Sequence, residues 1–401
     1  MFKIGIIREG KVPPDSRVPL NPVQCKSAIE THSVEIRIQR SSGRCFTDQE
    51  YESAGLQLED DVTDCEVLLG VKEVPIEMLV PNKTYFFFSH TIKEQAYNRA
   101  LLQAVLKKNI RLIDYEVLTN AKGRRLIAFG VFAGMVGAHN GLMTFGNRTG
   151  QFQLPRMNSF FDYAEAVAHY QTMDWPPIKI VLTGTGRVGK GAAKVLTDMG
   201  IKRVEPADFL KQNHKQAVFT QLQCRHYAWR KSDHGFDKQE FYESPDRYES
   251  RFQPYFQKAD LMINGIYWDN RAPAFFTVDD MQQSDFNLQV VADVTCDIAP
   301  VSSIPSTLFA STIADPVFGF DPKTGKAVEP YLAHAVDMMT VDNLPNELPR
   351  DASTSFGEQF LEHILPELLK PKSSILDRAT VAVNGDLGKH FKYLRGYVDH
   401  T

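Results

Sequence analysis

The stretch Val181–Ala192, VLTGTGRVGKGA, places three glycines in a G-x-G-x-x-G spacing between an apolar run and a segment of helical character. This spacing, with a strand before it and a helix after it, is the fingerprint of a dinucleotide-binding βαβ unit. The first glycine makes the tight turn, the second lets the backbone approach the pyrophosphate, and the third lets the helix pack on the strand. Backbone N–H groups at the start of the helix would hold the phosphates. The predicted cofactor-binding residues of this loop are Gly184, Gly186, Arg187, Val188 and Gly189.

The composition is that of a globular protein with a full hydrophobic core. With 401 residues, of which 43% are hydrophobic, the chain can form two or three domains of roughly 150 residues each. A net charge of −4 and the lack of Lys/Arg clusters disfavour nucleic acid as a partner. No apolar run approaches the roughly 20 residues that span a bilayer, and the N-terminus leads straight into a strand pattern. We therefore expect a cytoplasmic protein that binds no membrane.

The five cysteines are odd in number and widely spaced, and no two of them have the C-x-x-C spacing. This pattern predicts reduced thiols rather than a disulfide framework or a zinc site. No cluster of His, Cys and Asp indicates another metal, so we expect a site without a metal ion.

Apolar strands alternate with helical segments in the first part of the chain, which predicts a parallel, doubly wound sheet. The predicted strands are Phe2–Ile7, Val34–Gln39, Val67–Val71, Thr84–Ser89 and Arg111–Asp114. Ligands of such sheets bind beyond the carboxyl ends of the strands. Four charged or titratable residues fall at these ends, namely Lys72, Glu73, His90 and Glu116.

The first domain stops before it has a closing layer of helices. Helical patterns at Phe356–Leu369 and Ile375–Val383 would supply that layer if the end of the chain returned to it. We therefore predict an α/β protein with two Rossmann-like doubly wound domains, the dinucleotide-binding one inserted in the other. The predicted substrate and catalytic domain comprises residues 1–136 plus 336–401, and the predicted dinucleotide-binding domain comprises residues 137–335.

Ordered motifs over nearly the whole chain resemble those of the lysine-forming saccharopine dehydrogenases. That family includes the lysine 2-oxoglutarate reductase half of a bifunctional lysine-degrading protein, and alanine dehydrogenase is a more distant relative. The motifs that carry the resemblance are REGKVPPDSRVPLNP, GVKEVP, FFFSHTIKEQAYN, LIDYEVL, GRRLIAFGVFAG, GTGRVGKGA, ADLMINGIYWD, VADVTCDI and VDNLPNELPRDAS. The segment RYESRFQPYFQKADLMINGIYWD looks closest to the reductase branch.

The resemblance implies an oxidoreductase that joins the ε-amine of lysine to the carbonyl of 2-oxoglutarate. The adduct is dehydrated to an imine, which a nicotinamide hydride reduces to saccharopine, or the reaction runs in reverse. Proton transfer at the amine and at the carbinolamine oxygen requires an acid/base pair, which the resemblance places at Lys72 and His90. A Lys at a strand end, among carboxylates, can be tuned towards neutral pH, where His already titrates.

The resemblance also implies which residues bind the substrates. Arg17 matches an arginine for a substrate carboxylate, which a guanidinium can grip through two parallel hydrogen bonds. Arg124 and Arg125 follow a glycine turn, and the sequence does not indicate which of the two faces the site. Two further matches are carboxylates that modulate the charge of the acid/base pair, Glu73 and Glu116.

The choice of cofactor depends on which segment forms the second strand of the dinucleotide-binding sheet. If Ile201–Val204 is that strand, Glu205 has the spacing of the acidic residue that binds the ribose of NAD. If Ala217–Leu222 is that strand, cationic residues follow it and suit the 2′-phosphate of NADP. The reductase-like resemblance leans the same way, so NADP is slightly favoured over NAD. Outside the glycine loop, the predicted cofactor-binding residues are Arg225 and Ile266, and the resemblance implies Asp342, which matches an aspartate near the cofactor and the catalytic His.

Two other functions stay open. An alanine-dehydrogenase-like deaminase would use the same Lys/His pair with a smaller pocket, whereas a nicotinamide-binding sensor would bind the cofactor without turnover. The expected partners are small molecules: lysine, 2-oxoglutarate and saccharopine. We expect a monomer or a small homo-oligomer.

Overall fold

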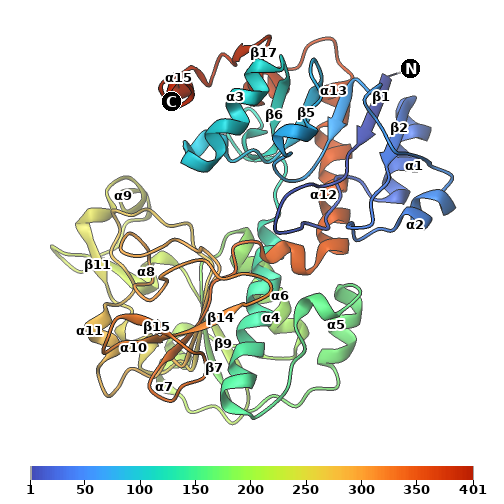
Figure 1. Cartoon of the computed structure of the whole chain (residues 1–401). Coiled ribbons are helices and arrows are strands. Elements are labelled where there is room, and N and C mark those ends of the chain that lie inside the picture. The colour runs from blue at the N-terminus through green and yellow to red at the C-terminus, as the bar shows by residue number, and fades with distance from the viewer. Residues whose placement is uncertain (1, 401) are drawn as a thin grey trace. The chain divides into compact units, whose positions relative to one another are not determined.

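The computed structural model describes residues 2–400 and divides the chain into two compact units (Figure 1). Unit 1 comprises Met1–Phe129 and Pro349–Thr401, and unit 2 comprises Gly130–Leu348. Unit 2 is thus inserted in unit 1, as the fold prediction requires. The units begin and end at other residues than the predicted domains, because the long helix α4 (Gly130–Thr149) lies wholly in unit 2 and residues 336–339 form a strand of the unit 2 sheet.

Unit 1 is built on an eight-stranded sheet with the order β18-β17-β6-β5-β4-β1-β2-β3. Its parallel strands are β1 (Phe2–Ile6), β2 (Val34–Gln39), β3 (Gln57–Glu59), β4 (Val67–Leu69), β5 (Thr84–Phe87) and β6 (Arg111–Asp114). The central strands are almost wholly buried, as expected of a parallel sheet covered on both faces. Two antiparallel strands, β17 (Thr380–Val383) and β18 (Asp386–Leu387), extend the sheet beyond β6.

The closing helices of unit 1 come from both ends of the chain. They are α1 (Pro22–His32), α2 (Asp48–Ser53), α3 (Arg99–Lys107), α12 (Pro349–His363), α13 (Leu365–Leu368), α14 (Ser374–Ala379) and α15 (Arg395–Asp399). Asn21 and Thr47 start α1 and α2 with capping boxes, which satisfy the first N–H groups of each helix. Phe356 and Phe360 of α12 join the same hydrophobic core as β4 and β5, so the C-terminal helices do return to the first sheet.

The helix predicted at Ile375–Val383 is wrong in its second half. Residues 380–383 form β17, which pairs antiparallel with β6. Three of these four residues are β-branched and suit a strand beside an open sheet edge. Since residues more than two hundred positions away form that edge, the local pattern could not reveal it.

Unit 2 contains a second eight-stranded sheet with the order β15-β14-β16-β13-β12-β7-β9-β8. Its parallel strands are β7 (Lys179–Thr183), β8 (Lys202–Arg203), β9 (Val218–Leu222), β12 (Leu261–Asn264), β13 (Val290–Asp293) and β16 (Val336–Met339). The antiparallel strands β14 (Val317–Asp321) and β15 (Lys326–Val328) complete one edge. The strand beside β7 is β9, so Ala217–Leu222 and not Ile201–Val204 supplies the second strand.

The glycine-rich α4 packs against α6 (Arg187–Asp198), the helix that follows the fingerprint loop. A Cβ atom on Gly134 would lie 1.9 Å from the carbonyl oxygen of Val188, and one on Gly191 would lie 1.9 Å from that of Val131. Only glycines permit this approach of the two backbones. The glycines of α4 and α6 therefore allow these two helices to pack closely within unit 2.

The remaining helices of unit 2 are α5 (Tyr163–Tyr170), α7 (Pro206–Lys211), α8 (Cys224–Tyr227), α9 (Lys238–Glu243), α10 (Gln253–Phe256) and α11 (Val278–Met281). An insertion between β9 and β12, residues 225–255, contains α9 and the antiparallel pair of β10 (Ala228–Arg230) and β11 (Tyr248–Ser250). Phe241 and Tyr248 of this insertion are buried. In the described part of the chain the cysteines are free thiols, and none of the helices has the length and apolar character needed to cross a bilayer.

Candidate functional site

Three titratable residues gather where β4 and β5 of unit 1 end. Lys72 and Glu73 follow β4, and His90 follows β5. The two segments stay side by side past the strands, since the N–H of Phe88 donates to the carbonyl oxygen of Val71 at 2.9 Å. His90 Nδ1 lies 2.5 Å from Glu73 Oε1, and Lys11 Nζ lies 2.9 Å from Glu73 Oε2. We refer to Lys72, Glu73 and His90 as the strand-end cluster.

The surroundings tune the cluster in opposite directions. Burial, followed by the charges of Arg17 and Lys11, lowers the pKa of Lys72 to about 8. Burial alone would raise the pKa of Glu73, but the hydrogen bond and charge of His90 together with Lys11 lower it to about 2. Among residues 2–400 no hydrogen-bond or ion-pair partner holds Lys72 Nζ. The cluster therefore offers an amine with a pKa of about 8 beside a carboxylate that is ionised at neutral pH.

Arg17 lies in a small polar cleft of about 150 Å³ within unit 1. Its guanidinium is only 3% exposed and pairs with Asp15 through Nε–H to Oδ1 at 2.9 Å and Nη2–H to Oδ2 at 2.6 Å. The guanidinium also lies 4.3 Å from the ring centre of Phe129. Glu9 and Lys11 line the same cleft. The sequence analysis did not identify Glu9, Lys11 and Asp15 as site residues. Their charges alternate in sign around Pro13 and Pro14, and this pattern could have indicated a polar site.

Glu116 and the two arginines lie on the segment that follows β6. Glu116 Oε1 is 3.8 Å from Lys93 Nζ, while its Oε2 is buried and has no hydrogen-bond partner in the described residues. Arg125 is half-buried and Arg124 is exposed. A buried acceptor without a donor suits a ligand that brings its own N–H or O–H group. Of the two arginines, Arg125 is the more shielded from solvent.

The glycine loop of unit 2 has the shape that a pyrophosphate needs. Gly184 has φ +91°, and a Cβ there would lie 2.4 Å from the carbonyl oxygen of Gly265. A Cβ on Gly189 would lie 2.1 Å from the carbonyl oxygen of Gly184, whereas one on Gly186 would meet nothing within 4 Å. The first and third glycines therefore close the turn, and the second leaves open space in front of the N-terminus of α6, where Arg187 and Val188 begin the helix.

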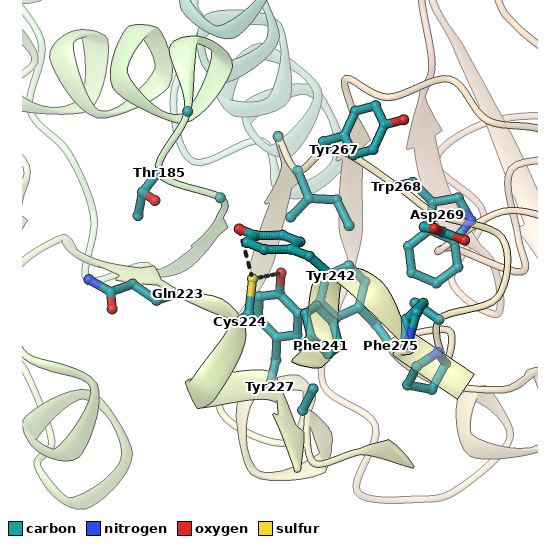
Figure 2. Close-up of a pocket in the computed structure, with 18 residues that line it drawn as sticks. Thr185, Gln223, Cys224, Tyr227, Phe241, Tyr242, Tyr267, Trp268, Asp269 and Phe275 are labelled. Atoms are coloured by element: carbon teal, nitrogen blue, oxygen red, sulfur yellow. Dashed lines mark hydrogen bonds between the residues drawn. The ribbon is translucent and has the colours of Figure 1, made fainter. Parts of the chain in front are cut away.

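A pocket of about 440 Å³ opens from this loop (Figure 2). Gln223 and Cys224 line it where β9 ends, and at this strand end no acidic residue is among the described lining residues to bind the ribose hydroxyls. Aromatic residues line much of the rest, namely Tyr227, Phe241, Tyr242, Tyr267, Trp268 and Phe275. The hydroxyls of Tyr227 and Tyr242 converge on Cys224 Sγ, at 3.2 and 3.9 Å. The sequence offered no signal that the insertion would contribute to this wall.

Of the other predicted cofactor residues, one lines the pocket and two are exposed. Ile266 lines the pocket, whereas Asp342 is exposed and follows β16. Arg225 is exposed on α8, directly after the lining residue Cys224, and its Nε lies 3.3 Å from His226 Nε2. Glu205 follows the edge strand β8, so it does not have the position from which an acidic residue binds the ribose. Within residues 2–400, no group of three or more His, Cys, Asp or Glu side chains could hold a metal ion.

Comparison with protein families matches residues 5–136 to the family described as alanine dehydrogenase/PNT, N-terminal domain. The chain is 31% identical to the mitochondrial alpha-aminoadipic semialdehyde synthase of Rattus norvegicus, over 95% of this chain and 46% of the relative. It therefore spans about half the length of that relative. It is also 26% identical to the saccharopine dehydrogenase [NAD(+), L-lysine-forming] of Emericella nidulans, over 92% of both chains.

Among solved structures, an L-alanine dehydrogenase superposes over 99% of this chain and 100% of its own, with a TM-score of 0.67 and 16% identity. This likeness concerns the fold alone. It supports the prediction of two Rossmann-like domains, one inserted in the other.

Proposed function

Because the chain belongs to the alanine dehydrogenase-like superfamily and has L-lysine-forming saccharopine dehydrogenases among its homologues, we propose that it is a nicotinamide-dependent oxidoreductase of that type. It would join lysine and 2-oxoglutarate to saccharopine, or catalyse the reverse reaction. The observation that carries the proposal is the strand-end cluster, in which an amine with a pKa of about 8 lies beside a His–carboxylate pair.

In the direction of condensation, the ε-ammonium group of lysine must first lose a proton. The neutral amine adds to the carbonyl carbon of 2-oxoglutarate, and protonation of the resulting hydroxyl lets water leave as the imine forms. The reduced cofactor supplies the hydride for the imine carbon. Lys72 and His90 move the protons at the amine nitrogen and the carbinolamine oxygen, and Glu73, which lies 2.5 Å from His90 Nδ1, keeps the imidazole oriented.

The substrates carry three carboxylates, and unit 1 offers cations for them. Asp15 and Phe129 hold the guanidinium of Arg17 in one orientation, so a substrate carboxylate would bind to a cation whose position is already fixed. We assign Arg125 rather than Arg124 to a second carboxylate, because Arg125 is half-buried whereas Arg124 is exposed. Glu116 would accept a hydrogen bond from the substrate amine through its Oε2. Unit 1 is thus the proposed substrate and catalytic domain.

Unit 2 is the proposed dinucleotide-binding domain, and we favour NADP(H) over NAD(H). The end of β9 carries Gln223 and Cys224 instead of an acidic residue, and the exposed Arg225 follows immediately. Asp269 is the one charged residue among the described lining residues, and its carboxylate is already paired with Arg271 at 2.7 Å. A 2′-phosphate would therefore meet a cation and no opposing carboxylate at this strand end.

The experiment is absorbance at the nicotinamide band with lysine plus 2-oxoglutarate, in parallel with NADPH and NADH, and with either substrate omitted. The proposal expects oxidation that needs both substrates and is faster with NADPH. Turnover with ammonia and a small keto acid, but not with lysine, would instead support an alanine-dehydrogenase-like deaminase. Cofactor binding without oxidation in any mixture would support a sensor. The cytoplasmic location and the oligomeric state stay predictions.

A further inference from the structure

We propose that Asp114 is a positioning residue that holds the acid/base residue His90 and the carboxylate Glu116 in place, although it does not touch the substrate itself. This inference rests on the proposed function of the strand-end cluster. Asp114 is the last residue of β6 and is fully buried. Neither the sequence pattern nor the mechanism above gave it a role.

One oxygen of Asp114 fixes the residue before His90. Its Oδ2 accepts the N–H of Ser89 at 3.0 Å and the hydroxyl of Ser89 at 2.5 Å. The Ser89 hydroxyl in turn lies 2.7 Å from Thr91 Oγ1 and accepts the N–H of Thr91 at 3.3 Å. Residues on both sides of His90 are therefore tied to one buried carboxylate.

His90 needs such a constraint, because its backbone has φ +52°. That left-handed conformation is unfavourable for a residue with a Cβ and persists only where the surroundings enforce it. The conformation starts the short helix η2 (Thr91–Lys93) directly after β5. With this backbone conformation, His90 Nδ1 lies 2.5 Å from Glu73 Oε1. If the backbone of His90 left the left-handed conformation, the imidazole would move away from Glu73.

The other oxygen of Asp114 fixes Glu116. Its Oδ1 accepts the N–H of Glu116 at 2.7 Å and thereby caps the helix η4 (Tyr115–Val117). One carboxylate thus links the ends of β5 and β6, which carry two candidate residues for the same reaction. Burial raises the pKa of Asp114, and the charge of Glu116 adds to this, while the hydrogen bonds from Ser89 and from the Glu116 N–H oppose it.

Glu9 makes the same kind of link at the neighbouring strand. Its Oε1 accepts the N–H of Val71 at 2.6 Å, and its Oε2 accepts the N–H of Lys72 at 2.9 Å. The two acidic side chains share a neighbour, since burial raises the pKa of the Tyr115 hydroxyl and the charges of Glu9 and Asp114 add to this rise. A repeated device at adjacent strand ends supports a positioning role more than an isolated cap would.

The test compares Asp114→Asn with the wild type and with Asp337→Asn. An amide keeps the shape but has one acceptor oxygen, so it can satisfy either Ser89 or Glu116 and points a donor at the other. Asp337 is an equally buried carboxylate in unit 2, paired with Arg148 at 2.8 Å and with the N–H of Tyr331 at 2.7 Å. It controls for the general effect of neutralising a buried acid.

We expect D114N to lower kcat by about tenfold or more, since small misplacements of an acid/base group are expensive, and to leave the KM for the cofactor unchanged. D337N should lower the melting temperature but retain kcat. A smaller fall in kcat is expected for Ser89→Ala, which keeps the backbone N–H bond to Asp114. Wild-type kcat in D114N, with a loss of melting temperature like that of D337N, would overturn the proposal.

A second readout does not depend on turnover. Because Glu73 is ionised, the short bond to it requires a proton on His90 Nδ1, and this proton should give a far-downfield NMR signal that disappears in His90→Gln. The proposal expects the signal to be lost or strongly shifted in D114N and retained in D337N. An unchanged signal in D114N would overturn it. Absence of turnover in the wild type would contradict the proposed function, while this signal would still decide the role of Asp114.

Discussion

The two sheets of this protein have related topologies but different chemistry at their carboxyl ends. In unit 1 the strands end on charged, half-buried side chains, with a carboxylate 2.5 Å from an imidazole. In unit 2 the equivalent edge presents a glycine loop, neutral polar groups and aromatic rings. Parallel strands offer the same location for a site in both cases. The residues that follow the strands decide whether the site moves protons or holds a large ligand.

The largest effect should come from removing the amine of the strand-end cluster. Lys72→Met is expected to lower kcat by about a thousandfold, because general acid–base groups contribute roughly 10²–10⁴ to a rate. The affinity for the cofactor, measured by the fluorescence of the reduced nicotinamide, should not change. The matched control Lys26→Met alters an exposed lysine of α1 and should be fully active. If K72M were as active as this control, the strand-end cluster of unit 1 would not be the site of proton transfer.

The second prediction concerns the glycine loop. Gly186→Ala adds a methyl group that meets no protein atom within 4 Å, so the melting temperature should stay constant. The methyl group would occupy the space meant for the pyrophosphate and should weaken cofactor binding by about tenfold or more, the equivalent of one or two lost hydrogen bonds. Titration calorimetry with NADPH measures this. Gly396→Ala, which is equally uncrowded in unit 1, is the control. Undiminished affinity in G186A would place the cofactor elsewhere.

The third prediction is a change in pH dependence. The charge of Glu73 raises the pKa of Lys72, opposing burial, so Glu73→Gln should move the pKa of Lys72 below its present value of about 8. In the rate profile of kcat/KM, the limb that reflects Lys72 should move to lower pH. Glu77→Gln, at the next exposed glutamate of the same segment, should leave the profile in place. A shift to higher pH would contradict the charge coupling.

The smallest effect is expected on stability. Burial raises the pKa of Glu9 from 4.5 to about 8, so the native protein keeps a proton that the unfolded chain releases. The stability contributed by this group is present below pH 4.5 and is lost as the pH rises through about 8. Glu9→Gln should therefore flatten the fall of the melting temperature over that interval. An identical slope in the variant would mean that Glu9 is ionised in the folded protein.

The sequence carries a more local signal for the unit 2 loop than for the unit 1 site, and the reason is physical. A phosphate site made of backbone N–H groups needs glycines at fixed local spacing, which can be read directly from residues 184–189. The strand-end cluster joins residues from different strands, and only their position after predicted strands suggested that Lys72, Glu73 and His90 lie at the same edge of the sheet. The resemblance to a family then supplied their roles.

What the sequence could not predict depends on distant pairing. Asp15 lies close to Arg17 in the chain, but its bidentate hold on that guanidinium follows from their burial together beside Phe129. The link from Asp114 to Ser89 requires β5 and β6 to lie in register, and the link from Glu9 to Lys72 requires the same of β1 and β4. The same holds for β17, which completes a sheet begun at the other end of the chain.

The most direct test of the account is the initial rate of NADPH oxidation by the full chain with lysine and 2-oxoglutarate, compared with mixtures that lack one of them. The account predicts oxidation with both substrates, none when either is omitted, and almost none in K72M at equal cofactor occupancy. Oxidation that is independent of lysine, or a K72M rate equal to that of the wild type, would contradict it.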